Sequence, residues 1–161
     1  MLGVVLLCTL ATSVFADPWY GSDSVAVGDV YSVTTLQGIA QAWVDGRLVV
    51  SSANLELQVQ VTFVGPINVV FRVLSGTFRV GNRDYVIDVG LWRGDYNLET
   101  HASVLQGPAT APDGEVGYFT LYGQDTAVSN GGVLTHVYSD FRGEYGALWH
   151  VNLAAVRYQN S

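Results

Sequence analysis

Apolar and polar residues alternate along most of the chain after residue 30, and this two-residue period is typical of strands that bury one face. The clearest example is the segment 55–63, LELQVQVTF, which places Leu, Leu, Val, Val and Phe on one face and polar residues on the other. Helical periodicity never persists over three turns, and the 18 glycines of the sequence disfavour helices. The pattern therefore predicts a chain built of strands.

Turn residues separate these strands at short intervals. Asp45-Gly46 lies between two apolar segments and predicts a two-residue hairpin, because both positions tolerate a positive φ. Gly81-Asn82-Arg83 predicts another hairpin. Later strands are expected at 91–92, 99–105, 116–122, 133–141 and 147–158. The spacing predicts an all-β fold, a single-domain antiparallel β-sandwich or β-barrel of about nine or ten short strands.

The first sixteen residues are typical of a signal peptide. They carry no charged side chain, and an apolar run from Leu2 to Leu10 is too short for the roughly 20 residues of a membrane-spanning helix. Val14 and Ala16 fit the small-residue pattern of a cleavage site before Asp17. We therefore expect residues 1–16 to be removed, residues 17–161 to form one all-β domain, and the protein to be secreted to the cell surface or extracellular space.

Cysteine and charge narrow the function further. Cys8 is the only cysteine and lies in the signal segment, so the mature chain is expected to have no disulfide and no thiolate metal site. The formal net charge is −7, and all seven basic residues are arginines. The chain has no basic cluster that could neutralise phosphates, so we do not expect nucleic acid as a partner. We also expect no stable insertion into a membrane.

Catalytic motifs are absent from the sequence. It contains no Gly-x-Ser-x-Gly, no His-Glu-x-x-His and no glycine-rich phosphate loop. Glu56 and Asp88 are the least implausible glycosidase pair, but no spacing brings them together. His136 and His150 lie on two strands expected to pair, where they could bind a metal together with His101 or a carboxylate. Two histidines on a half-exposed sheet face are the simpler interpretation. We therefore expect a protein without enzymatic activity.

No cofactor is predicted, with calcium as a possible exception. Turn carboxylates are the hard oxygen ligands that calcium prefers, and acidic residues gather near the mature N-terminus and in one later turn. The alternative is that they are solvated turn residues that keep the protein soluble. The candidate calcium ligands are Asp17, Asp23, Asp29, Asp113 and Glu115.

Aromatic residues suggest a binding surface. Exposed tryptophan and tyrosine rings on a β-sheet stack against sugar rings, and Trp19, Trp92 and Trp149 are the candidates for such a platform. Trp19 and Trp92 stand beside turn-like residues and are expected to be exposed. The alternative is that the aromatic residues fill a core that has no disulfides.

The tripeptide Arg93-Gly94-Asp95 matches the sequence that integrins recognise. A similar sequence, Arg142-Gly143-Glu144, occurs later in the chain. The parallel favours two tight structural turns over an adhesion motif.

Two functions remain. The first is a secreted structural or assembly protein (a filament, sheath or surface-layer subunit) that self-associates by strand exchange of residues 17–35. The residues expected to form the exchanged strand are Val25, Val27, Val30 and Val33. The alternative is an extracellular binding module for carbohydrate, such as a polysaccharide, or for a small apolar ligand.

A third interpretation is an eight-stranded outer-membrane barrel. Several expected strands fall short of the nine to eleven residues that such a barrel needs, and the chain ends at Arg157-Tyr158-Gln159-Asn160-Ser161 without a terminal aromatic residue. Alternating strands are equally common in soluble sandwiches, so this interpretation is the least favoured.

Overall fold

The computed structural model describes residues 25–129, 132–142 and 147–160. Within these ranges the chain forms nine strands and no helix, which confirms the all-β class. The strands are β1 (Val30–Val44), β2 (Arg47–Val64), β3 (Asn68–Val80), β4 (Arg83–Ile87), β5 (Arg93–Asn97), β6 (Ala102–Thr110), β7 (Val116–Ser129), β8 (Gly132–Arg142) and β9 (Leu148–Gln159).

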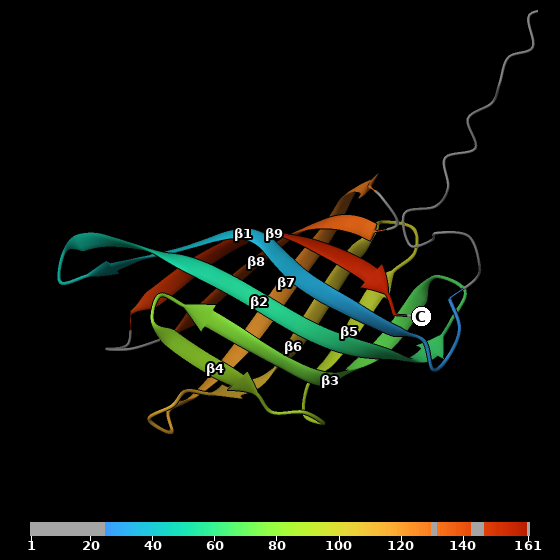
Figure 1. The fold of residues 1–161 in the computed structure, drawn as a ribbon, viewed down its shortest axis with the longest axis horizontal. Helices are drawn as coiled ribbons and strands as arrows, with labels where there is room; N and C mark the ends of the chain where they lie inside the picture. The colour runs from blue at the N-terminus through green and yellow to red at the C-terminus, as the bar shows by residue number, and fades with distance from the viewer. Residues whose placement is uncertain (1–24, 130–131, 143–146, 161) are drawn as a thin grey trace, which may run out of the picture.

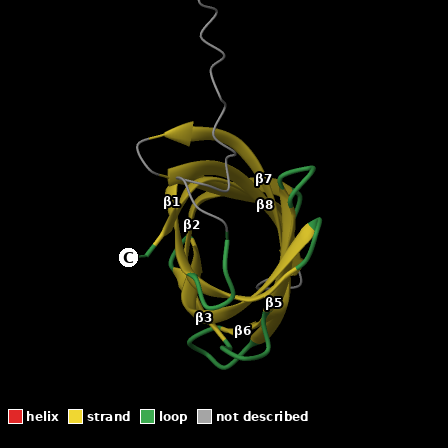
Figure 2. Cartoon of the chain, turned by 90° about the vertical axis from the view of Figure 1, so that its right-hand side faces the viewer, coloured by secondary structure: helices red, strands yellow, loops and turns green. Residues whose placement is uncertain are grey.

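All strands belong to one antiparallel sheet, and this sheet closes on itself (Figures 1 and 2). Sequential neighbours pair from β1 to β3 and from β6 to β9, and β1 also pairs with β9. The short strands β4 and β5 share one position in the wall, because each pairs with a different part of β3 on one side and of β6 on the other. Of the two architectures that the sequence left open, the pairing gives a barrel.

The period-two pattern decides which side chains enter the barrel. In β2, Leu55, Leu57, Val59 and Val61 are buried, whereas the alternating polar residues stand on the outer wall. The Asp45-Gly46 hairpin is confirmed: φ is 50° at Asp45 and 74° at Gly46, as a tight hairpin between twisted strands requires.

Aromatic rings fill much of the interior. Phe119 lies 4.6 Å from Phe141 and 5.3 Å from both Phe78 and Tyr85, measured between ring centroids. The free space left between the walls is about 60 Å³, which leaves room for only a few water molecules. The barrel interior is therefore a packed core.

A charged cluster lies at the edge of this core. The carboxylate of Asp125 accepts hydrogen bonds from Arg157 Nη2 (2.7 Å), Tyr96 Oη (2.8 Å) and Thr135 Oγ1 (2.7 Å). The Arg157 guanidinium also lies 4.9 Å from the centre of the Tyr96 ring. Burial of Tyr96, reinforced by the Asp125 charge, raises the pKa of its hydroxyl far above the usual value.

Several expected boundaries are wrong. Residues 91–92 lie in the link between β4 and β5, and the strand follows them at Arg93–Asn97. Arg93-Gly94-Asp95 is therefore part of a strand paired on both sides, with β3 and β6, and does not form a tight turn. Most strands are also longer than expected; β2 alone has 18 residues.

The part of the chain that the structure describes has no helix long and apolar enough to cross a membrane. The predicted signal peptide, residues 1–16, lies outside the described residues.

Candidate functional site: a polar groove on the outer wall

Two β-bulges shape the outer wall of the barrel around β2. In β1 the pairing register shifts between Thr34 and Ile39, and in β3 it shifts at Leu74. Gly38 lies inside the first bulge, where a Cβ atom would overlap the carbonyl oxygen of Ala53. Bulges bend and twist the strand that carries them, and these two border the surface between them.

Polar side chains line up in rows across this surface. One row crosses β1, β2 and β3 through the pairs Thr34–Glu56 and Glu56–Thr77, and it reaches β4 at Val86. Residues paired across antiparallel strands point to the same face, so these side chains stand together on the outer wall.

The neighbouring row begins on β9. Tyr158 pairs with Ser32, Ser32 with Gln58, and Gln58 with Ser75. The two rows together bring hydroxyl, amide and carboxylate groups from four strands to one surface.

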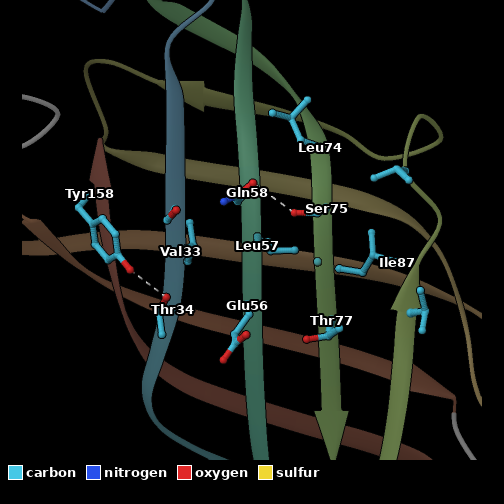
Figure 3. A pocket seen from close by; sticks show the side chains of 14 residues that line it. Val33, Thr34, Glu56, Leu57, Gln58, Leu74, Ser75, Thr77, Ile87 and Tyr158 are labelled. Atoms are coloured by element: carbon cyan, nitrogen blue, oxygen red, sulfur yellow. Dashed lines mark hydrogen bonds between the residues drawn. The ribbon is translucent and has the colours of Figure 1, made fainter. Parts of the chain in front are cut away.

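These rows border a groove of about 530 Å³ (Figure 3). Its apolar border includes Leu74, Val86 and Val89, and the ring of Tyr158 stands at the β9 end. A second hollow of about 310 Å³ is lined in part by the same Glu56 and Thr77. The groove is therefore far larger than the space left inside the barrel, and it falls within the 300–1,000 Å³ of ordinary ligand sites.

Only weak hydrogen bonds join the groove residues to one another. Tyr158 Oη lies 3.4 Å from Thr34 Oγ1, and Ser75 Oγ donates to Gln58 Oε1 over 3.4 Å. Within the described ranges, the exposed Glu56 carboxylate accepts no hydrogen bond. Ser32 Oγ donates to Asn160 Oδ1 over 2.9 Å, whereas much of the remaining donor and acceptor capacity of the groove faces solvent.

A charged pair stands at one end of the second hollow. Arg79 on β3 and Asp84 on β4 face each other and form a bidentate ion pair. The hydrogen bond from Arg79 holds the pKa of the Asp84 carboxyl below its usual range. Asp84 is therefore ionised and engaged at neutral pH, and Glu56 is the carboxylate left open to a ligand.

The arrangement can form many neutral hydrogen bonds beside an apolar border. Hydroxyl and amide side chains both donate and accept, which matches the hydroxyl groups of a sugar. The groove offers a ligand one open carboxylate and no second acid paired with it, and Asp88, which sequence reasoning grouped with Glu56, does not line it.

The expected tryptophan platform is not assembled. Trp92 is 1% exposed, so the expectation that it is exposed is wrong; its ring fits against Gly107, and its indole N–H donates to the carbonyl oxygen of Pro108. Trp149 is half-buried and packs against the core. Trp19 lies outside the described residues.

The candidate calcium ligands have other partners where the structure describes them. Arg83 forms ion pairs with both Asp113 and Glu115. The backbone N–H of Glu115, helped by Arg83, holds the pKa of the Asp113 carboxyl below its usual range. Asp29 accepts a hydrogen bond from the N–H of Ala26.

No group of three or more acidic, histidine or cysteine residues able to hold a metal occurs among the described residues. Asp17 and Asp23 lie outside them, so the calcium hypothesis stays a prediction for that segment.

The two strand histidines are not brought together. His136 faces Ala154 in the β8–β9 ladder, whereas His150 faces Asp140 and places its Nδ1 2.7 Å from that carboxylate. His101 lies at the β5–β6 turn, with its Nδ1 3.1 Å from Tyr96 Oη.

The described part of the segment expected to exchange between molecules, residues 25–35, contacts its own chain. Val30 and Val33 belong to β1, which pairs with β2 on one side and β9 on the other. The residues before it form a turn against the end of β2, where Gly28 N–H donates to Val61 O (2.9 Å). Val25 packs against the core and Val27 is exposed. Strand exchange of residues 25–35 would have to break these contacts, and residues 17–24 lie outside the described residues.

Sequence reasoning missed one aromatic surface. Tyr122 and Tyr138 are paired neighbours on β7 and β8, and their exposed rings stack at 4.8 Å with an interplanar angle of 15°. The sequence shows that both tyrosines alternate with apolar residues, but it does not show the strand register that places them opposite each other.

No protein-family model matches this chain, and neither a curated protein nor a solved structure is significantly similar to it.

Proposed function

We propose that the protein is a carbohydrate-binding module that holds a neutral glycan in the outer groove formed by β1, β2, β3, β4 and β9. The supporting observation is the groove itself: hydroxyl, amide and carboxylate side chains stand in register across four strands, and apart from Ser32, which donates to Asn160, they form only long hydrogen bonds with one another. The sequence had also suggested a carbohydrate-binding module as the alternative function, but with the three tryptophans as its binding residues.

The chemistry of the groove favours a neutral ligand. Glu56 is the open carboxylate, and the Arg79 guanidinium nearby is already paired with Asp84. An anionic ligand would meet Glu56 without a free cation in the groove, whereas sugar hydroxyls would donate to that carboxylate. The apolar border of Leu74, Val86 and Val89 would contact the C–H face of a pyranose ring.

A titration with neutral oligosaccharides, followed by NMR, tests the proposal. We expect saturable shifts of the side-chain amide of Gln58 and of the backbone amides of Ser75 and Thr77. A Ser75→Trp variant, which fills the groove, should abolish the response, and a Thr100→Trp variant in an exposed turn should keep it. The proposal fails if no oligosaccharide in the panel causes saturable shifts, or if the two variants respond alike.

The secreted assembly subunit remains a second candidate. It is supported by a free strand edge on the β1–β2 hairpin, residues 47–51 of β2, which do not line the groove. Secretion and the absence of enzymatic activity also stay predictions.

A further inference from the structure

The β1–β2 hairpin extends beyond the closed part of the barrel (Figure 1). The pairing of β2 with β3 ends at Ala53–Val80, and Gly81 N–H donates to Ser52 O (2.8 Å) as the last bond on that side. Among the described residues, no strand pairs with residues 47–51 on the side away from β1. This stretch of β2 is therefore a free sheet edge.

The hairpin register identifies the backbone groups at this edge. Val44 and Arg47 close a two-residue turn, and such a closing pair is hydrogen-bonded. Hydrogen-bonded and non-bonded pairs alternate along an antiparallel ladder, so Leu48 and Val50 belong to non-bonded pairs and turn both their N–H and C=O groups outward. The bond at Ser52, two residues further, agrees with this alternation.

Natural edge strands are normally protected by charges, prolines or bulges. Arg47, beside the turn, is the one charged residue of this edge, and residues 48–51, LVVS, contain no charge, proline or bulge, although the chain carries a net charge of −7. Leu48, Val50 and the neighbouring Trp43 are 52%, 59% and 68% exposed. The edge residues 47–51 include no acidic residue, so two such edges could pair without placing like negative charges opposite each other.

We propose that this edge pairs with the same edge of a second copy of the chain. A two-fold axis through Val49 places Leu48 opposite Val50 of the partner copy and Val50 opposite its Leu48. All four outward groups of each copy then meet a complementary group, and the exposed side chains of Leu48 and Val50 lie on the same face as their counterparts. The two barrels become joined by one continuous sheet.

The contact is small. The exposed large apolar side chains beside the edge are Leu48, Val50 and Trp43, so each copy contributes little apolar surface to the contact. Stable complexes bury about 800 Å² per partner, so the dimer is weak and forms reversibly with concentration.

Sedimentation velocity of the full chain from about 10 µM to about 1 mM tests the proposal. We expect a shift from monomer to dimer over this range. Val50→Pro removes only an N–H that points away from β1, so the hairpin ladder is kept, and the dissociation constant should rise at least tenfold. Val50→Thr keeps the N–H and should dimerise like the parent.

Hydrogen exchange at low and high concentration locates the interface. The amides of Leu48 and Val50 should gain protection in the dimer. If Val50→Pro does not fold, Val50→Lys, which keeps the backbone and adds a repelling charge, replaces it. A chain that stays monomeric to about 1 mM overturns the proposal. So does a dimer whose Leu48 and Val50 amides stay unprotected or that tolerates the edge variant.

Discussion

Arg157 and Asp125 form an ion pair in the wall of the barrel: Nη2 lies 2.7 Å from Oδ2, and the two side chains are 8% and 2% exposed. The pair joins β9 to β7 across the intervening β8, which contributes Thr135 as a further donor to the same carboxylate. Because buried charges are costly unless they are fully paired, we infer that this cluster fixes how the three strands sit rather than binding a ligand.

Asp125→Asn should therefore destabilise the protein strongly. The substitution keeps the shape but leaves the Arg157 guanidinium without its buried carboxylate, and breaking such a pair costs about 3–5 kcal/mol. Urea unfolding followed by circular dichroism measures the loss. Asp140→Asn is the control, because its pair with His150 is half-exposed and should contribute less than about 1 kcal/mol. Equal losses of unfolding free energy for the two substitutions would show that the buried pair contributes no more to stability than the exposed pair.

Gly38→Ala should destabilise the fold through the β1 bulge. The added methyl group would overlap the backbone oxygen of Ala53, which cannot move without shifting a strand, and a methyl group of the buried Leu153 side chain, which would have to repack. Overpacking of this kind costs about 1–3 kcal/mol. Gly117→Ala is the comparison, since its Cβ would meet only the ring of Phe119, and it should lower the unfolding free energy less. A smaller effect at position 38 than at position 117 would contradict the role of the bulge.

Alternation along the sequence was sufficient to predict the fold class, because each strand carries its own inward and outward faces. In β2 the pattern correctly separated Leu55 and Leu57 from Glu56 and Gln58. The hairpin at Asp45-Gly46 was equally readable, since its backbone requirement is local. Closure into a barrel was not, because it depends on β1 meeting β9, more than a hundred residues later.

The groove could not be predicted for the same reason. Its residues come from β1, β2, β3, β4 and β9, and only the register of five strands makes them neighbours. For Trp92, the sequence led to the wrong prediction of an exposed side chain. Its surroundings in sequence, between Gly90 and Gly94, indicated an exposed turn, but the ring is covered because Gly107 on β6 leaves space for it.

Alkaline pH should destabilise the protein through Tyr31. Burial of this residue, reinforced by the charge of Asp29, raises the pKa of its hydroxyl to about 12 from an unfolded value of 10.0. The stabilisation is therefore complete below pH 10 and is lost as the pH rises toward 12, with a total of about 2–3 kcal/mol. Unfolding free energies measured across this range should fall less steeply for Tyr31→Phe. The exposed Tyr118→Phe should follow the parent, and identical slopes for all three proteins would contradict the assignment.

Glu56→Gln should separate ligand binding from stability. The Glu56 carboxylate is exposed, accepts no hydrogen bond from the described residues and attracts Arg79 only across an exposed surface, so its neutralisation should change the unfolding midpoint little. A bound sugar hydroxyl would donate to this carboxylate, and a charge-assisted bond is worth about 1 kcal/mol more than a neutral one. Glycan affinity, measured by calorimetry, should thus fall about five- to tenfold. Glu99→Gln, an exposed acid in the β5–β6 turn, should bind like the parent. A Glu56→Gln variant with full affinity would exclude the centre of the groove as the sugar site.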